Sequence, residues 1–203
     1  HYEGPFAVVA HIKNGNRLLC LSAMAEQRGL KRGMGLADAR SFCPEIQTVE
    51  YNPQVDVAFQ NSLVRWAKRY CPWVGKSGID GLSLDAAGSA HLFGGEDAML
   101  HDMRARLIRS KLTVRIGLAD TVGAAWALAR FGEGCAEGGG TGQAISALPV
   151  ASLRISAKED TTLQRLGVKT IGQLANLPRA TIGQRFGPSV LMRLDLSLIH
   201  ISE

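Results

Sequence analysis

The chain has 203 residues, of which 46% are hydrophobic and 20% are charged. These proportions fit one good-sized globular domain, alone or with a small companion, and they exclude a disordered or fibrous chain. No apolar run approaches the roughly 18 residues of a membrane span, and no basic stretch followed by an apolar run opens the chain as a secretory signal does. Four cysteines without a C-x-x-C pair predict free thiols in a reducing cytosol and neither a zinc site nor a disulfide framework. They are Cys20, Cys43, Cys71 and Cys135.

The net charge of +5 is unevenly distributed. The segment 148–193 has only Glu159 and Asp160 as acidic residues, and its basic residues are Arg154, Lys158, Arg165, Lys169, Arg179, Arg185 and Arg193. Its excess of five positive charges equals the net charge of the whole chain, so the remainder is neutral. A neutral body with a basic C-terminal quarter favours contact with a polyanion such as nucleic acid. The alternative is a solvated helical surface, because Lys and Arg also promote solubility.

The first predicted elements are a β-hairpin and a short helix. The apolar runs 5–12 and 17–21 flank the turn-forming residues 13–16, a pattern typical of two antiparallel strands. Ser22 is placed to cap a helix that ends near Gly29. The chain starts at His1 and its first recognisable element already has the pattern of a buried strand. We therefore expect that an upstream strand is missing and that the chain is a fragment.

Two helices separated by a strand follow. The first, 34–42, should stop before Pro44, because the residue before proline avoids the helical region. Residues 46–51 alternate as a strand does. The segment 55–70 repeats apolar residues at three- and four-residue spacing, which predicts an amphipathic helix.

The segment 73–85 is predicted to be a strand with residues 78–85 as its core. Alternation along a regular strand puts Asp80 and Asp85 on opposite faces. A charged helix, 96–112, comes next, followed by an apolar segment, 113–119, that should be a central strand.

An alanine-rich helix, 121–130, precedes a glycine-rich segment. The latter, 132–142, has six glycines in eleven residues and predicts a flexible connection and a domain boundary. It lacks the Lys-Ser/Thr ending of a phosphate-binding loop.

The last predicted unit is helical. Helices 159–166 and 170–177 are joined at Gly167, and a further helix follows Pro178. Short helices with tight glycine turns can offer backbone N–H groups to phosphates, although a plain structural bundle has the same pattern. The final segment, 196–203, breaks the pattern and resembles translated sequencing-adapter read-through, so we exclude it from fold reasoning.

Three segments in this order resemble the Y-family, UmuC/DinB-type translesion DNA polymerases. The first runs from Gly29 to Pro44 and is similar to the family's G-[VI]-x-x-x-M…C-P element. The second is Gly78-Ile79-Asp80-Gly81-Leu82-Ser83-Leu84-Asp85, similar to the catalytic S-[IL]-D-E-x-x-[LI]-D strand. The third, 163–174 followed by Arg185-Phe186-Gly187, is similar to the thumb.

The resemblance extends from about Pro5 to Arg193 and implies an α+β fold. Residues 1–131 would form an N-terminally truncated palm and fingers, with a mixed sheet and flanking helices. Residues 132–147 would be the glycine-rich connection, and 148–195 a small all-helical, helix-hairpin-helix-like thumb. The family's DNA-gripping little finger would not be included.

The chain departs from the family at the catalytic site. The family holds two divalent cations with an Asp from the first strand and an adjacent Asp-Glu pair. Here the pair is Asp80-Gly81, so Asp80 is the only candidate catalytic and metal-binding residue, and one carboxylate is too little charge for two hard cations. Asp80 could equally be a strand-edge residue that makes a turn hydrogen bond. We expect no cofactor, and Mg²⁺ if the protein is active.

The nucleotide-contacting residues of the family are also replaced. Ala23 and Glu26 stand where active members have a Tyr and an Arg, and a glutamate repels a triphosphate. Arg28 lies two positions away. The family's Lys after the 113–119 segment is absent, and Arg130 is a displaced substitute.

With these departures the sequence resembles the ImuB-type branch of the family, whose members have degraded active sites. The resemblance implies an adaptor in damage-induced mutagenesis that pairs with an ImuA-like protein, an error-prone replicative-type polymerase and the sliding clamp, in the bacterial cytoplasm on the nucleoid and without a membrane. We expect weak, sequence-independent binding to DNA phosphates. The residues expected to carry it are Arg154, Lys158, Lys169, Arg179 and Arg185.

Two alternatives stay open at this point. One is a working lesion-bypass polymerase that combines an upstream Asp with Asp80 and an unconventional ligand such as Asp85. The other is a helical DNA-binding module fused to an unrelated α/β enzyme.

Overall fold

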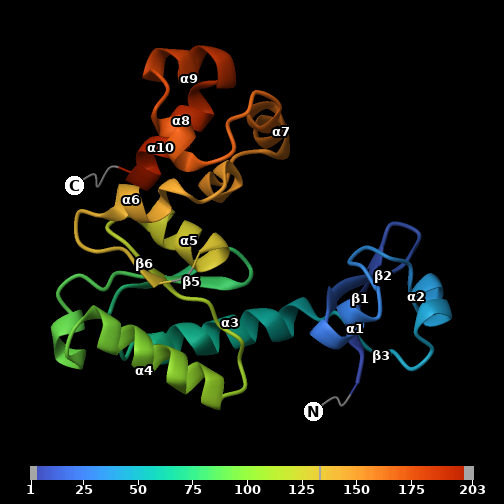
Figure 1. The fold of residues 1–203 in the computed structure, drawn as a ribbon. Helices are drawn as coiled ribbons and strands as arrows, with labels where there is room; N and C mark the ends of the chain where they lie inside the picture. The colour runs from blue at the N-terminus through green and yellow to red at the C-terminus, as the bar shows by residue number, and fades with distance from the viewer. Residues whose placement is uncertain (1–3, 133, 199–203) are drawn as a thin grey trace. The chain divides into compact units, whose positions relative to one another are not determined.

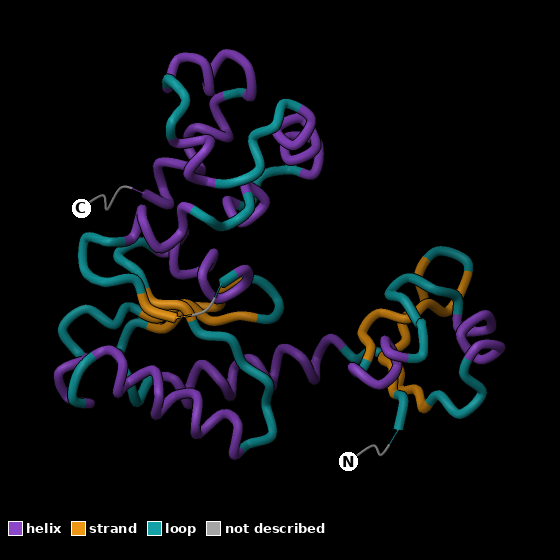
Figure 2. Tube along the Cα trace, in the orientation of Figure 1, coloured by secondary structure: helices purple, strands orange, loops and turns teal. Residues whose placement is uncertain are grey.

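The computed structural model of the protein describes residues 4–132 and 134–198 (Figure 1). Its elements, in chain order, are β1 (Phe6–Ile12), β2 (Gly15–Leu21), α1 (Ala23–Gln27), α2 (Leu36–Phe42), β3 (Gln47–Glu50), α3 (Pro53–Ala67), β4 (Val74–Ser77), β5 (Gly81–Leu84), the 3₁₀ helix η1 (Ala90–Phe93), α4 (Glu96–Arg109), β6 (Gly117–Leu118), α5 (Val122–Phe131), β7 (Gly134–Cys135), α6 (Thr141–Ser146), the 3₁₀ helix η2 (Val150–Leu153), α7 (Ala157–Arg165), α8 (Ile171–Ala175), α9 (Arg179–Phe186) and α10 (Pro188–Leu198). Helices dominate and the strands form three small sheets (Figure 2).

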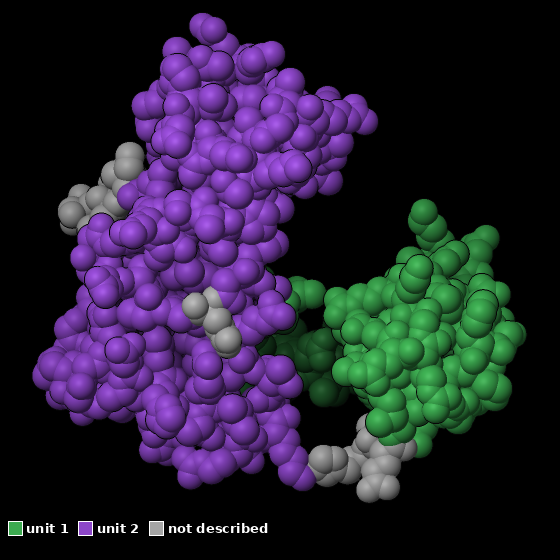
Figure 3. All heavy atoms as spheres, viewed as in Figure 1, with its two compact units in different colours: residues 1–66, 78–80 green, residues 67–77, 81–203 purple. Residues whose placement is uncertain are grey.

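The chain divides into two compact units. One comprises the residues up to 66 together with 78–80, and the other comprises 67–77 and the residues from 81 onward (Figure 3). This division falls within α3 and the following hairpin, so it does not coincide with the boundary expected in the glycine-rich segment.

The first unit is built on a three-stranded sheet of order β2-β1-β3. The β1–β2 pair is antiparallel and the β1–β3 pair is parallel, so the predicted hairpin and the strand after it are confirmed. Ser22 caps α1 as predicted, because its Oγ accepts a hydrogen bond from the Ala25 N–H at 3.2 Å. Ala7, Leu18 and Leu30 are buried in the core that this sheet shares with α1 and α2.

Helix α3 begins at Pro53 and confirms the predicted helix, but its apolar stripe is not buried. Val55 is 60% exposed and Phe59 is 50% exposed, and Ala67 is the one buried residue that α3 contributes. The three- and four-residue spacing therefore predicts the helix correctly, but it does not by itself bury Val55 and Phe59.

The segment around Asp80 differs from the single strand that the sequence predicts. It is an antiparallel hairpin in which β4 and β5 pair from Val74 with Leu84 to Ser77 with Gly81. The turn between them is residues 78–80, and Gly78 has a φ of +69°, which favours glycine. The argument that puts Asp80 and Asp85 on opposite faces assumes a regular strand, and it does not apply here because Asp80 lies in this turn and Asp85 follows β5.

The strand predicted at 113–119 is also much shorter in the structure. Only Gly117 and Leu118 form β6, and their parallel partner is the equally short β7. A strand is defined by its partner as well as by its own propensity, and β7 offers two residues.

The glycine-rich segment is more structured than a flexible connection. It contains β7 and the start of α6, and Gly139 adopts a φ of +77°. The Asp120 carboxylate accepts hydrogen bonds from the Gly139 N–H at 3.1 Å and the Thr141 hydroxyl at 2.7 Å. These bonds attach the segment to the residues before α5.

The C-terminal helices share one apolar core with α5. Its fully buried members include Leu163 of α7, Leu174 of α8 and Ile182 of α9, together with Ala124 of α5. The Thr121 hydroxyl, at the N-cap of α5, donates to the Ser197 carbonyl at 2.9 Å. Residues 196–198 of the proposed adapter segment therefore continue α10, while 199–203 lie outside the described residues.

The mixture of helices and small sheets confirms the predicted α+β class. Among the described residues, no helix is both long enough and apolar enough to cross a bilayer.

Candidate functional site

Asp80 is held in an exposed turn at the tip of the β4–β5 hairpin. Its neighbour Ile79 is 93% exposed. An ideal Cβ at Gly81 would lie only 2.8 Å from the Ser77 carbonyl oxygen across the hairpin. A glutamate at residue 81 would therefore require the hairpin backbone to shift, so the tight turn and the missing second carboxylate go together.

The carboxylates near this turn do not form a metal site. The Asp85 Oδ1 accepts a hydrogen bond from the Ala87 N–H at 3.0 Å, so it stabilises the turn that follows β5. Within residues 4–132 and 134–198, no three His, Cys, Asp or Glu side chains converge as metal ligands. Two hard cations need several converging oxygens, so this donor set does not fit the pair of Mg²⁺ ions used in phosphoryl transfer.

The residues expected near an incoming nucleotide have other contacts. The Arg28 Nη1 lies 2.6 Å from the Glu45 Oε1, so the guanidinium that could replace the family's arginine forms an exposed ion pair. Arg130 places its guanidinium 5.4 Å from the centre of the Trp126 ring, within cation–π range. Glu26 is exposed in α1.

The five predicted DNA-binding residues come from one helical region. Arg154 follows η2, Lys158 is in the first turn of α7, Lys169 joins α7 to α8, and Arg179 and Arg185 are at the two ends of α9. All five are exposed. The shared core fixes the helices that carry them, and this is what the structure adds to the sequence prediction.

Capping boxes fix the starts of α7 and α8. Ser156 Oγ accepts from the Glu159 N–H at 3.2 Å, and the Glu159 carboxylate accepts from the Ser156 N–H at 2.7 Å. Thr170 and Gln173 repeat the arrangement in α8, where Gln173 Oε1 also accepts from the Lys169 N–H at 2.8 Å. Each box satisfies N–H groups that the first helical turn leaves without partners.

Glu159 also connects α7 to α10. Its second carboxylate oxygen accepts a hydrogen bond from the Ser189 hydroxyl. This bond, followed by those from Ser156, lowers the pKa of the Glu159 carboxyl. Hydrogen bonds to the ionised form favour that form.

Arg179 already has an acidic partner within the protein. Its guanidinium forms an ion pair with the Asp195 carboxylate of α10. Among residues 4–132 and 134–198, Arg179 is therefore the one of the five predicted residues that has an acidic partner.

Arg154 has contacts that sequence reasoning missed. Its guanidinium lies 5.2 Å from the centre of the Trp126 ring, and its pKa is lowered by partial desolvation beside the protein surface and by the charge of Arg193. The four-residue spacing from Trp126 to Arg130 on α5 was a usable signal for that pair. Nothing in the sequence indicates that Arg154, which belongs to another element, meets the same ring.

The impB/mucB/samB family profile matches residues 1–130. Protein ImuB of Caulobacter vibrioides is 44% identical over 177 residues, which are 86% of this chain and 39% of that protein. DNA polymerase IV of Dehalococcoides mccartyi is 27% identical over 169 residues, which are 80% of this chain and 43% of that protein. The chain thus spans less than half the length of these two relatives.

The fold has close counterparts among solved structures. The crystal structure of DinB from Sulfolobus solfataricus matches with a TM-score of 0.77 at 18% identity, covering 98% of this chain and 61% of that chain. At this identity the likeness concerns the fold, and it confirms the polymerase-type α+β architecture expected from the three sequence segments.

Proposed function

Because this chain belongs to the impB/mucB/samB family of Y-family polymerase-like proteins, we propose that it is a DNA-binding adaptor in damage-induced mutagenesis, without polymerase activity of its own. Its kinship with ImuB and with DNA polymerase IV supports a role related to DNA damage. The geometry at Gly81 carries the proposal, because a side chain at residue 81 would lie 2.8 Å from the Ser77 carbonyl oxygen at its Cβ and would force the hairpin backbone to shift.

The positive charges support the other half of the proposal. Exposed Lys and Arg side chains on well-packed helices can neutralise DNA phosphates without reading bases, so binding would be sequence-independent and salt-sensitive. Among the predicted residues, Lys158, Lys169 and Arg185 form no ion pair within the part of the chain that the structure describes.

The partners of this adaptor are proposed by resemblance to ImuB. They are an ImuA-like protein, an error-prone replicative-type polymerase and the sliding clamp. A bacterial protein with these partners and with affinity for DNA would act in the cytoplasm on the nucleoid, in the SOS response to DNA damage.

Template-directed primer extension by the full-length protein tests the proposal. We expect no incorporation above background with Mg²⁺ or Mn²⁺, and no difference between the wild type and Asp80→Ala. A catalytically active Y-family polymerase assayed alongside is the positive control. Robust extension that Asp80→Ala abolishes would overturn the adaptor proposal.

A lesion-bypass polymerase is the second candidate, favoured by the 27% identity to DNA polymerase IV. Gly81→Glu separates it from the adaptor. In a polymerase weakened only by the missing carboxylate, this substitution should increase incorporation. If the turn excludes the side chain, Gly81→Glu gains no activity and lowers the thermal midpoint.

A further inference from the structure

The three-stranded sheet of the first unit has one covered edge and one open edge. At the β2 edge, the Leu18 N–H donates to the Met34 carbonyl at 3.0 Å, and the Gly33 N–H donates to the Leu18 carbonyl at 2.8 Å. The segment 33–35 therefore closes that side of the sheet. The other edge is β3, which lies at the end of the order β2-β1-β3 (Figure 1). A further strand could join this sheet only along β3.

The backbone of β3 presents hydrogen-bonding groups on its outer side. The Gln47 N–H donates to the Pro5 carbonyl at 2.9 Å and the Tyr51 N–H donates to the carbonyl of residue 9 at 2.7 Å, so the odd-numbered residues face β1. These groups alternate in direction along a strand, so the N–H and C=O groups of Thr48 and Glu50 point away from β1. Within residues 4–132 and 134–198, none of these outward groups has a hydrogen-bond partner. Unpaired edge groups of this kind are a template for an incoming strand.

The two faces of β3 expose different side chains. Val9 of β1 is buried in the core that the sheet shares with α1 and α2. Val49 pairs with Val8, the neighbour of Val9, so it lies on the face away from this core. Val49 is 40% exposed and Tyr51, on the same face, is 38% exposed, whereas Glu50 is exposed on the opposite face. A strand added at this edge would therefore place apolar side chains beside Val49 and Tyr51 and polar ones beside Glu50.

The charge around this edge indicates which polar side chains fit. Residues 41–64 contain three acidic side chains and no Lys, Arg or His. Glu45 is paired with Arg28 at 2.6 Å, whereas neither Glu50 nor Asp56 forms an ion pair within the part of the chain that the structure describes. The whole chain has a net charge of +5, so this edge is opposite in sign to the protein that carries it. An acidic edge favours Lys or Arg on the incoming strand, and it disfavours DNA and a second copy of the same edge.

We propose that β3 binds an extended segment of a partner protein as a fourth strand, and that this segment alternates Lys or Arg with apolar residues. Backbone hydrogen bonds to Thr48 and Glu50 supply affinity, and the alternating side chains supply specificity. Apolar side chains cover Val49 and Tyr51, and a cation lies beside Glu50. The inference goes beyond the proposed function, because it concerns a polypeptide at a surface that has none of the predicted DNA-binding residues.

The probe is a fluorescein-labelled peptide, Lys-Val-Lys-Val-Lys-Val-Lys, titrated with the full-length protein and followed by anisotropy. It should bind, and the same peptide N-methylated at every internal amide should bind about tenfold more weakly, because it lacks the N–H donors of a strand. A peptide with Glu in place of each Lys should also lose about tenfold, since it places like charges beside Glu50. Hydrogen exchange of residues 46–52 should become slower when the first peptide binds.

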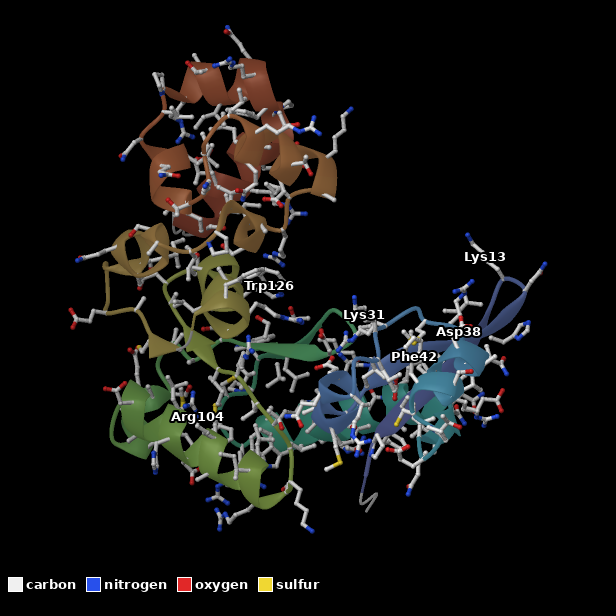
Figure 4. All side chains as sticks on the ribbon, turned by 45° about the vertical axis from the view of Figure 1, so that its right-hand side comes forward. Lys13, Lys31, Asp38, Phe42, Arg104 and Trp126 are labelled. Carbon is white, nitrogen blue, oxygen red and sulfur yellow. The ribbon has the colours of Figure 1, made fainter. Side chains whose placement is uncertain are left out.

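Two substitutions at Glu50 test the site from the side of the protein. Glu50→Pro removes an outward N–H that β1 does not use, and an edge strand tolerates proline, so the sheet should stay folded while binding weakens about tenfold. Glu50→Gln keeps the backbone and removes one charge, and it should weaken binding about threefold. Asp38→Asn is the matched control, because Asp38 is an exposed acidic residue on α2, and it should leave binding unchanged (Figure 4).

The outcomes distinguish strand docking from other uses of this edge. If the peptide does not bind, the proposal is overturned, and Glu50 then protects a bare edge against pairing. Equal binding of the N-methylated peptide, or an equal loss in Asp38→Asn, would reduce the effect to general attraction between charges and would also overturn it. Slow exchange of residues 46–52 before peptide is added would mean that another part of the full-length protein covers β3, and a dimer that Glu50→Pro dissociates would assign the edge to a second copy. Either result overturns the proposal, and none of these outcomes bears on primer extension or DNA binding.

Discussion

The β4–β5 hairpin and the C-terminal helices differ in how much of the Y-family polymerase pattern they retain. The hairpin keeps Asp80, but Gly81 stands where its companion carboxylate would be, and Ile79 at its tip is 93% exposed. The helical region has a dense core in which Leu174 and Ile182 are fully buried, with exposed cations on its helices. Metal chemistry needs several groups converging on one point, whereas phosphate binding needs only cations on rigid elements. Loss of one carboxylate is therefore expected to impair metal chemistry before it affects phosphate binding by the helical region.

The largest expected effect is on the free energy of unfolding, and it distinguishes an isoleucine in the helical core from an isoleucine at the hairpin tip. Ile182→Ala, in the helical core, should lower the free energy of unfolding by about 2–5 kcal/mol, because it removes buried methylenes and leaves a cavity. Ile79→Ala, at the hairpin tip, should change it by less than about 0.5 kcal/mol. Denaturant unfolding of both variants checks the contrast. Similar losses would show that the hairpin tip is packed against something in solution.

The next effect concerns the charge of the helical region. Replacing Lys158, Lys169 and Arg185 by Glu should reduce the slope of log K against log salt for duplex DNA by about 2.7, at about 0.9 for each lost phosphate contact. Anisotropy titrations over a range of salt measure it.

The control is a second triple variant, which makes the same change in net charge but has its three substitutions in the first unit. Lys13, Lys31 and Arg40 are exposed there, and their replacement by Glu should leave the slope near the wild-type value. Figure 4 labels Lys13 and Lys31. Equal reductions in the two triple variants would mean that DNA is attracted by overall charge and that the helical region has no special role.

A smaller effect is expected at the start of α7. Ser156→Ala removes the hydroxyl that accepts from the Glu159 N–H, and it should cost about 1 kcal/mol of stability. Ser41→Ala, in the exposed last turn of α2, is the matched control and should be neutral or slightly stabilising, since alanine is the better helix former. Thermal melts of both variants distinguish a cap from a general effect of losing a hydroxyl.

Signals that are local in sequence predict local structure well. The cap at Ser22 is set by a residue three positions away and was predicted, whereas α7 begins at Ala157 after its cap at Ser156, two residues before the predicted start at 159. The β4–β5 hairpin was missed because the apolar pattern of 78–85 reads as a continuous strand, whereas Gly78 and Gly81 permit a tight turn. The absence of a second carboxylate beside Asp80, in contrast, was visible directly in the sequence, because Gly81 has no side chain.

Features that depend on distant partners could not be predicted. The apolar spacing of α3 does not indicate that Val55 and Phe59 stay exposed, since burial depends on what packs against a helix. The ion pair of Arg179 with Asp195 and the approach of Arg154 to Trp126 join separate elements. Only the packing of α5, η2, α9 and α10 brings these side chains together.

The smallest effect is a pH dependence located in the helical region. Hydrogen bonds from Ser189 and Ser156 lower the pKa of Glu159 below its ordinary value of 4.5. A carboxyl whose pKa is lowered by folding contributes stability above its unfolded pKa, and that contribution is lost as the pH falls through the folded value. Glu159→Gln keeps a capping-box residue but cannot titrate. The wild-type melting temperature should therefore fall more steeply than that of Glu159→Gln below about pH 4.5. Parallel curves would show that the bond between α7 and α10 contributes nothing to acid stability, and the helical region would then owe its rigidity to its apolar core alone.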